Sequence, residues 1–124
     1  MSKDLALPGP DVPVIDETRL LEEFGGDQEI LNELRDLFLE HVPPLFEDIV
    51  QAVNSNDFET MASNVHSLKG ACATYGAPRL SMVCMEMEKW ARTGEMDSVK
   101  ANLDLLRDEY EKVYNQIKAM GVTV

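Results

Sequence analysis

A histidine, a lysine and a glycine are grouped in a segment with helical spacing, and their types and spacing are suited to chemistry. His66 is followed three residues later by Lys69 and four residues later by Gly70. Residues three and four positions apart are neighbours on a helix surface. Glycine within a helix costs about 1 kcal/mol relative to alanine. We infer that Gly70 leaves room for a bulky group to reach the imidazole, and that Lys69 supplies a positive charge beside it.

The surroundings of His66 on this helix are small side chains. With about 100° between successive residues, the apolar residues of the segment form an arc centred about 120° away, so we expect His66 on the flank of the core. An exposed imidazole is largely neutral at pH 7 and can act as a nucleophile, and a lysine suits the oxygens of a phosphoryl group. The geometry favours a group-accepting histidine, with a simple surface histidine as the alternative. The helical neighbours of His66 are Ala62, Lys69, Gly70, Ala73 and, one turn further, Glu59.

Other kinds of site fit the sequence less well. His41 has bulky neighbours and no cation or glycine beside it, so we interpret it as a structural or surface residue. The Glu-x-x-His pattern of di-iron bundles is absent, and two histidines and two cysteines without a close pair make a poor zinc set, so no metal is expected. A hydrolase would need a nucleophile beside His66, but Ser67 projects about 100° away on the helix. An interaction bundle without chemistry is the remaining rival.

Composition and charge restrict the function further. The chain has 124 residues and a net charge of −12. This length favours one domain, and the acidic excess argues against binding to nucleic acid or anionic membranes. No run of about 18 apolar residues predicts a membrane helix, and the N-terminus lacks the apolar stretch of a secretory signal. We therefore expect a cytoplasmic protein in which Cys72 and Cys84 are buried thiols rather than a disulfide.

The chain is expected to be helical throughout its folded part. Residues 1–14 contain three prolines and predict a flexible tail, followed by one domain at 15–121. The expected fold is all-α, an antiparallel up-down four-helix bundle with a short extra N-terminal helix. In the helix predicted from Asp57 to Gly76, the expected core residues are Phe58, Met61, Val65, Leu68 and Cys72. Helical spacing and capping residues predict a short helix after Asp16 that ends at Gly25. They then predict one long helix at about 28–54 that is kinked at Pro43 and Pro44, with two separate helices as the alternative. Three more helices are expected, from Asp57 to Gly76, from Pro78 to Gly94, and a last one capped by Asp97 or Ser98.

The segment around His66 resembles the histidine-phosphotransfer (HPt) domains of multistep phosphorelays. That family has a His-x-Leu-Lys-Gly core on a bundle helix, then a small residue and a second glycine. The departures are minor: a methionine replaces a leucine in the following helix, and Val65 and Tyr75 differ from the commoner residues. The matching residues are His66, Leu68, Lys69, Gly70, Ala71 and Gly76, followed by Ala77, Leu80, Cys84, Met87 and Glu88, and the likeness extends over about residues 14–118.

The resemblance implies a phosphocarrier and no kinase. His66 would accept a phosphoryl group from an aspartyl phosphate on one receiver domain and pass it to another, with Lys69 compensating the added charge and Gly70 giving access. Receiver domains of hybrid histidine kinases and response regulators would be the partners, and the receiver would carry the Mg²⁺, so the chain needs no cofactor of its own. We expect a monomer without an ATP-binding region. The docking candidates near His66 are Leu21, Phe24, Leu37 and Phe38.

Overall fold

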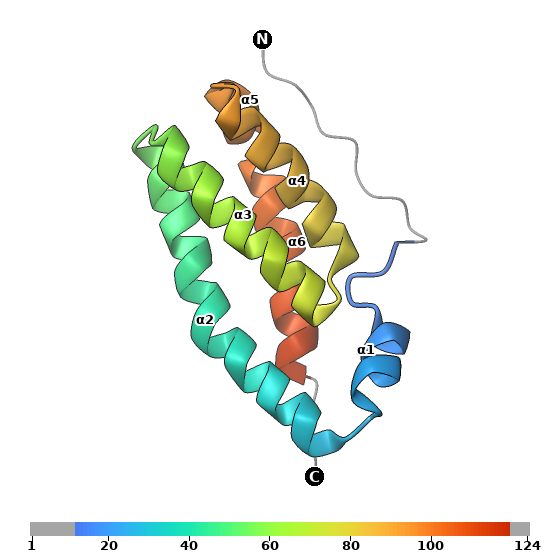
Figure 1. The fold of residues 1–124 in the computed structure, drawn as a ribbon. Coiled ribbons are helices and arrows are strands. Elements are labelled where there is room, and N and C mark those ends of the chain that lie inside the picture. Colours follow the sequence, from blue (N-terminus) through green and yellow to red (C-terminus); the bar gives the residue numbers. More distant parts are fainter. Residues whose placement is uncertain (1–11, 120–124) are drawn as a thin grey trace.

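The protein forms a bundle of long helices, with shorter helices beside them (Figure 1). The computed structural model describes residues 12–119, and within that range every regular element is a helix. α3 packs mainly against α2 and α4, and α6 packs against α4 and α2. The predicted all-α bundle with a short N-terminal helix is confirmed. The elements are α1 (Glu17–Phe24), α2 (Gln28–Asn54), α3 (Phe58–Tyr75), α4 (Pro78–Arg92), α5 (Met96–Ala101) and α6 (Leu103–Ala119).

The ends of the first helices follow the capping residues of the sequence. The Asp16 side chain accepts a hydrogen bond from the backbone N–H of Arg19, and Asp57 caps α3 in the same way. At the other end of α3, Gly76 has φ +66°, a left-handed conformation that glycine adopts without a steric penalty. Local chemistry alone therefore sets both ends of the helix that carries His66.

The two prolines do not interrupt α2. The helix is continuous from Gln28 to Asn54 with Pro43 and Pro44 inside it, so the prediction of one long helix is confirmed. Each proline removes a backbone donor and normally breaks a helix. Here the apolar face continues across them, with Val42 and Phe46 buried on either side. We infer that burial of this face outweighs the lost hydrogen bonds.

The prediction of a single last helix is wrong, because this part of the chain forms two helices. The structure divides it into α5 and α6, and α5 begins after Glu95 without a side-chain cap. At the break, the side chain of buried Asn102 donates to the backbone oxygen of Ser98 at 2.8 Å. An asparagine side chain that bonds nearby backbone offers the chain an alternative to the helix. Val99 and Leu106, on the two sides of the break, are nonetheless fully buried.

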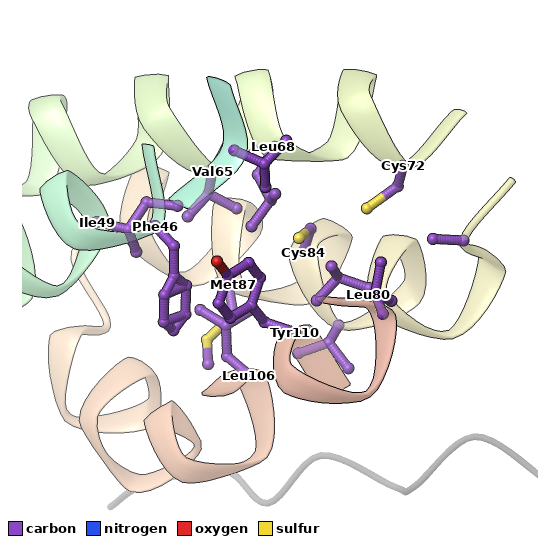
Figure 2. Packing of buried hydrophobic residues seen from close by; sticks show 14 of the residues in the cluster. Phe46, Ile49, Val65, Leu68, Cys72, Leu80, Cys84, Met87, Leu106 and Tyr110 are labelled. Carbon is purple, nitrogen blue, oxygen red and sulfur yellow. The ribbon is translucent and has the colours of Figure 1, made fainter. Parts of the chain in front are cut away.

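The core lies between the four long helices (Figure 2). Ile49 of α2, Leu68 of α3 and Met87 of α4 meet there. Cys72 and Cys84 are buried free thiols, as expected. One predicted core residue is wrong: Phe58 is 38% exposed, because it lies at the first position of α3, where the end of the bundle leaves its ring partly uncovered.

The first described residues contact the bundle. Val12 accepts a hydrogen bond through its backbone oxygen from Arg79, and Val14 packs against the core. The prediction had placed both in the flexible tail. The rest of the predicted tail, residues 1–11, lies outside the described residues, as do the last positions of the predicted 15–121 domain. Within the described range no helix is long and apolar enough to cross a membrane.

Candidate functional site

His66 lies in the middle of α3 with its side chain turned away from the core. The imidazole is 62% exposed, whereas the neighbouring Val65 and Leu68 are completely buried. This is the flank position that the helical wheel predicts. The helix is fixed by its buried face, so the backbone below His66 has little freedom, and the ring stands at the surface on a rigid support.

A carboxylate from the next helix holds the inner nitrogen of the ring. Nδ1 of His66 lies 3.2 and 3.1 Å from the two carboxylate oxygens of Glu88 in α4. An ionised carboxylate can only accept hydrogen bonds, so this contact assigns the proton of the neutral imidazole to Nδ1. It leaves the lone pair of Nε2 unused and therefore available to an electrophile.

Two cations share the same carboxylate. Lys69 Nζ donates to Oε1 of Glu88 at 3.0 Å, and Arg92 Nε donates to Oε2 at 2.8 Å. Burial by itself would raise the pKa of Glu88, which is only 8% exposed, but hydrogen bonds from Lys69, Arg92 and His66 outweigh burial and lower that pKa to about 2. Glu88 is therefore ionised at neutral pH. Lys69 forms an ion pair with Glu88, so its charge beside His66 is not unpaired.

Sequence reasoning missed the role of Glu88. The residue appeared only as part of the family pattern, because the angular count compared residues of one helix and Glu88 comes from another. One signal could have found it. Glu88 falls at the edge of the apolar face of α4, beside buried Met87, with Arg92 one turn later. A glutamate near a core face usually needs a partner, and Arg92 satisfies that need only in part.

The space around Gly70 is open. A Cβ built on Gly70 would meet no atom within 4 Å, so nothing in the described part of the chain requires glycine there. This observation agrees with a role in admitting an external group. Ala73 is exposed as well, but Ala62 is buried. Of the small neighbours that the helical spacing gives His66, Gly70 and Ala73 therefore lie at the surface, whereas Ala62 is part of the core.

A polar hollow adjoins His66 on the side of the α3 N-terminus. Its volume is about 500 Å³, and it opens widely to solvent. Hydroxyl, amide and charged groups line it, so it suits polar contacts rather than an apolar ligand. Its lining residues are Glu59, Thr60, Ser63, Asn64, His66 and Arg92. Among the residues that the structure describes, no group of three or more His, Cys, Asp and Glu side chains could hold a metal ion.

The predicted docking residues differ in exposure. Leu21 and Leu37 are 53% and 45% exposed, and Phe24 is half-buried. The prediction of Phe38 as a docking residue is wrong, because its side chain is only 2% exposed. Its ring packs edge-on against the ring of Tyr75, with 5.3 Å between the two ring centroids. His41 is exposed on α2, in agreement with its interpretation as a structural or surface residue.

Comparison with known proteins decides the family. The family model described as Hpt domain matches residues 33–116. The chain belongs to the Hpt domain family. This match contains α3 and α4, and with them the His66, Lys69, Gly70 and Glu88 cluster. The family assignment and the geometry of the site therefore concern the same part of the chain.

Relatives of this Hpt domain occur in plants and bacteria. Histidine-containing phosphotransfer protein 1 of Oryza sativa subsp. japonica is 33% identical over 52% of this chain and 44% of its own length, so the match spans less than half of that relative. Histidine-containing phosphotransfer protein 2 of the same plant is 22% identical over 84% of this chain and 71% of its own. The signal transduction histidine-protein kinase BarA of Escherichia coli strain K12 is 25% identical over 75% of this chain, but that is only 10% of the kinase.

A solved structure shares the fold. The crystal structure of the maize histidine-containing phosphotransfer protein ZmHP2 matches with a TM-score of 0.73 over 86% of this chain and 82% of the maize chain, at 24% identity. At this identity the match establishes the arrangement of the helices and nothing finer. The bundle of this Hpt domain is thus one that a known phosphotransfer protein also adopts.

Proposed function

We propose that this Hpt domain is a phosphocarrier in which Nε2 of His66 accepts a phosphoryl group from the aspartyl phosphate of a receiver domain. The observation that carries the proposal is an exposed imidazole whose Nδ1 is held by the buried carboxylate of Glu88. This leaves one nitrogen, Nε2, to react. The names of the plant relatives and of the bacterial kinase support the same role.

The transfer needs little chemistry from this chain. The lone pair of Nε2 attacks phosphorus, the bond between phosphorus and the aspartyl oxygen breaks, and the aspartate leaves as a carboxylate. Catalysis of such a transfer is mainly positioning and charge compensation. Here rigid α3 positions the nucleophile, while Lys69 and Arg92, both beside His66 through Glu88, can compensate the phosphoryl charge. The Mg²⁺ would come with the receiver, so the chain carries no cofactor of its own.

The partners that this role requires are receiver domains of hybrid histidine kinases and response regulators. The exposed Leu21 and Leu37 offer apolar contacts for docking. The open space at Gly70 lets a second active site close over His66. In this proposal the chain passes the group on reversibly, has no kinase activity, and acts in the cytoplasm as a monomer.

The test is phosphate exchange with purified receiver domains from the same genome. Radiolabelled phosphoryl groups should pass from a receiver to the wild-type chain and to the His41→Gln control, and His66→Gln should remove this transfer completely while keeping the helical fold. The label should be lost in acid and kept in base, as expected for a phosphohistidine. Label that persists on His66→Gln would refute the proposal.

The rival function is a bundle that binds receivers without phosphotransfer. The exposed Leu21 and Leu37 would serve either role, so binding alone does not distinguish the two. If His66→Gln and the wild type bind the same receivers and neither takes up label from any of them, the interaction module is the better description.

A further inference from the structure

The C-terminal end of α3, the helix that carries His66, is closed by residues from the start of the described chain. A helix leaves its last carbonyl groups without partners inside the helix, and its C-terminus carries a partial negative charge. The last turn of α3 has no basic residue of its own. Instead, the guanidinium of Arg19 in α1 donates a hydrogen bond to the backbone oxygen of Ala73. The backbone N–H of Asp16 donates to the oxygen of Gly76 at 2.7 Å, so α1 and the residue before it cap the helix that presents His66.

The attachment of α1 to the bundle depends on a small number of contacts. Within α1 only Leu20 is buried, and its Cγ would be 3.6 Å from a Cβ placed on Gly76, so it packs against the end of α3. Ile15, just before α1, is buried as well, and Figure 1 shows α1 to one side of the four long helices. Nε of Arg19 also bonds Glu23 one turn further along α1 at 2.9 Å. This one guanidinium therefore links the body of α1 to the backbone of α3.

The point of attachment lies on the same side of α3 as His66. Ala73 follows His66 by seven residues, which is two helical turns, so it returns to that side about 10 Å further along the axis. A standard protein interface covers about 800 Å² on each partner, a patch about 30 Å across. A receiver that closes over His66 therefore reaches α1 as well. Leu21 is 53% exposed and Phe24 is half-buried, so α1 offers such a partner apolar contacts.

We propose that Arg19 is a positioning residue that binds the carbonyl of Ala73 and so holds α1 beside His66, with Leu21 and Phe24 in place for a docking receiver. This inference rests on the proposed function. Arg19 acts through α1 and takes no part in the phosphoryl transfer itself. Its loss should weaken the binding of a receiver and leave the reaction of the bound receiver with His66 unchanged.

The first measurement needs no receiver. Amide hydrogen exchange in Arg19→Gln should be about tenfold faster than in the wild type throughout α1, because a hydrogen bond from a charged donor is lost and little other contact holds this helix. Glutamine has a similar helix propensity, so the substitution does not itself disfavour the helix. Glu23→Gln is the matched control, since it removes the ion pair within α1 and keeps the bond to Ala73. Equal exchange of α1 in Arg19→Gln and the wild type would overturn the proposal.

The second measurement is single-turnover transfer from a phosphorylated receiver. Arg19→Gln should raise the receiver concentration at half-maximal rate by about fivefold and leave the maximal rate unchanged, as expected when binding alone is weakened. Arg19→Lys, which keeps the charge and a donor, should recover most of the wild-type affinity. Arg107→Gln removes the same charge from an exposed position of α6 and should behave as the wild type. A lowered maximal rate with unchanged affinity would place Arg19 in the chemistry and overturn the proposal.

These measurements separate failure of the inference from failure of the proposed function. If no receiver exchanges label with the wild type, the proposed function fails, and faster exchange of α1 in Arg19→Gln still establishes Arg19 as the residue that holds this helix. If receivers exchange label and bind Arg19→Gln as tightly as the wild type, the role of Arg19 fails while the phosphocarrier stands.

Discussion

Two glutamates of this protein, Glu88 in α4 and Glu109 in α6, are both largely buried and both bind an arginine, yet their surroundings differ. Glu109 is 1% exposed, and Nε of Arg79 donates to both of its oxygens at 3.1 and 2.9 Å. Arg79 is itself mostly covered and also bonds the backbone oxygen of Val12. Glu88 instead divides its oxygens among three donors that reach the surface.

The comparison shows how similar chemistry serves structure in one place and a site in another. Around Glu109 the charges satisfy each other, and the pair joins α4 to α6 and to the chain before α1. Around Glu88 the carboxylate orients an imidazole and holds two cations at the edge of solvent. Burial fixes both carboxylates. Glu109 holds only cations, Arg79 and the partly exposed Lys112, whereas Glu88 also holds an exposed imidazole that a partner can approach.

The largest expected effect is on the free energy of unfolding, and it tests the structural role of Glu109. Glu109→Gln should lower the free energy of unfolding by about 3 kcal/mol or more, because removing one partner of a buried ion pair leaves the other charge uncompensated. Denaturant unfolding followed by circular dichroism measures this change. Phosphorylation of the folded fraction should stay at the wild-type level. A loss of phosphorylation at unchanged stability would erase the distinction between the two glutamates.

The next expected effect concerns the access of a receiver to His66 through the open space at Gly70. Gly70→Leu should fold, since a Cβ at this position meets no atom, but transfer from a receiver should slow by about tenfold or more, because a misplaced reacting group costs one to two orders of magnitude. Rapid-quench kinetics with a phosphorylated receiver gives the rate. Ser67→Leu, on an exposed position of the same helix, is the matched control. Wild-type rates in Gly70→Leu would assign the glycine another role.

A smaller effect is expected at Lys69. Lys69→Ala should shorten the lifetime of the phosphorylated state or lower its yield by several-fold, because one of two nearby cations is lost. The stability of the bundle should change by less than about 1 kcal/mol, since a partly exposed ion pair contributes little. Lys89→Ala, at an exposed position of α4, is the control. A destabilisation as large as that of Glu109→Gln would show that both clusters are structural.

The last expected effect is the response of stability to acid. The pKa of Glu88 is lowered from 4.5 to about 2, so its ionised form stabilises the fold above pH 4.5, and this contribution is lost as pH falls toward 2. The stability difference between the wild type and Glu88→Gln should therefore shrink over that range. Hydrogen bonds from Thr60 also lower the pKa of Asp57, but this contribution is common to both proteins and cancels. A stability difference between the two proteins that does not change with pH would contradict the lowered pKa of Glu88.

Much of the fold follows from the order of residues along the chain. Capping aspartates, turn glycines and helical spacing predicted α1 to α4 closely, because each depends on contacts within a few residues. The grouping of His66, Lys69 and Gly70 could be predicted for the same reason, since all three belong to one helix. The break at Asn102 was missed, because a side chain that bonds the backbone of Ser98 leaves no trace in the apolar spacing.

By itself, the sequence determined the helices, the flank position of His66 and the small neighbours Gly70 and Ala73. Only the tertiary structure decided that Glu88 bonds Nδ1, that Lys69 and Arg92 share the same carboxylate, and that Ala62 and Phe38 are buried. The physical reason is that spacing fixes which residues are neighbours on one helix. The register of α3 against α4 depends on how their buried side chains pack together, and that packing places the carboxylate beside the histidine.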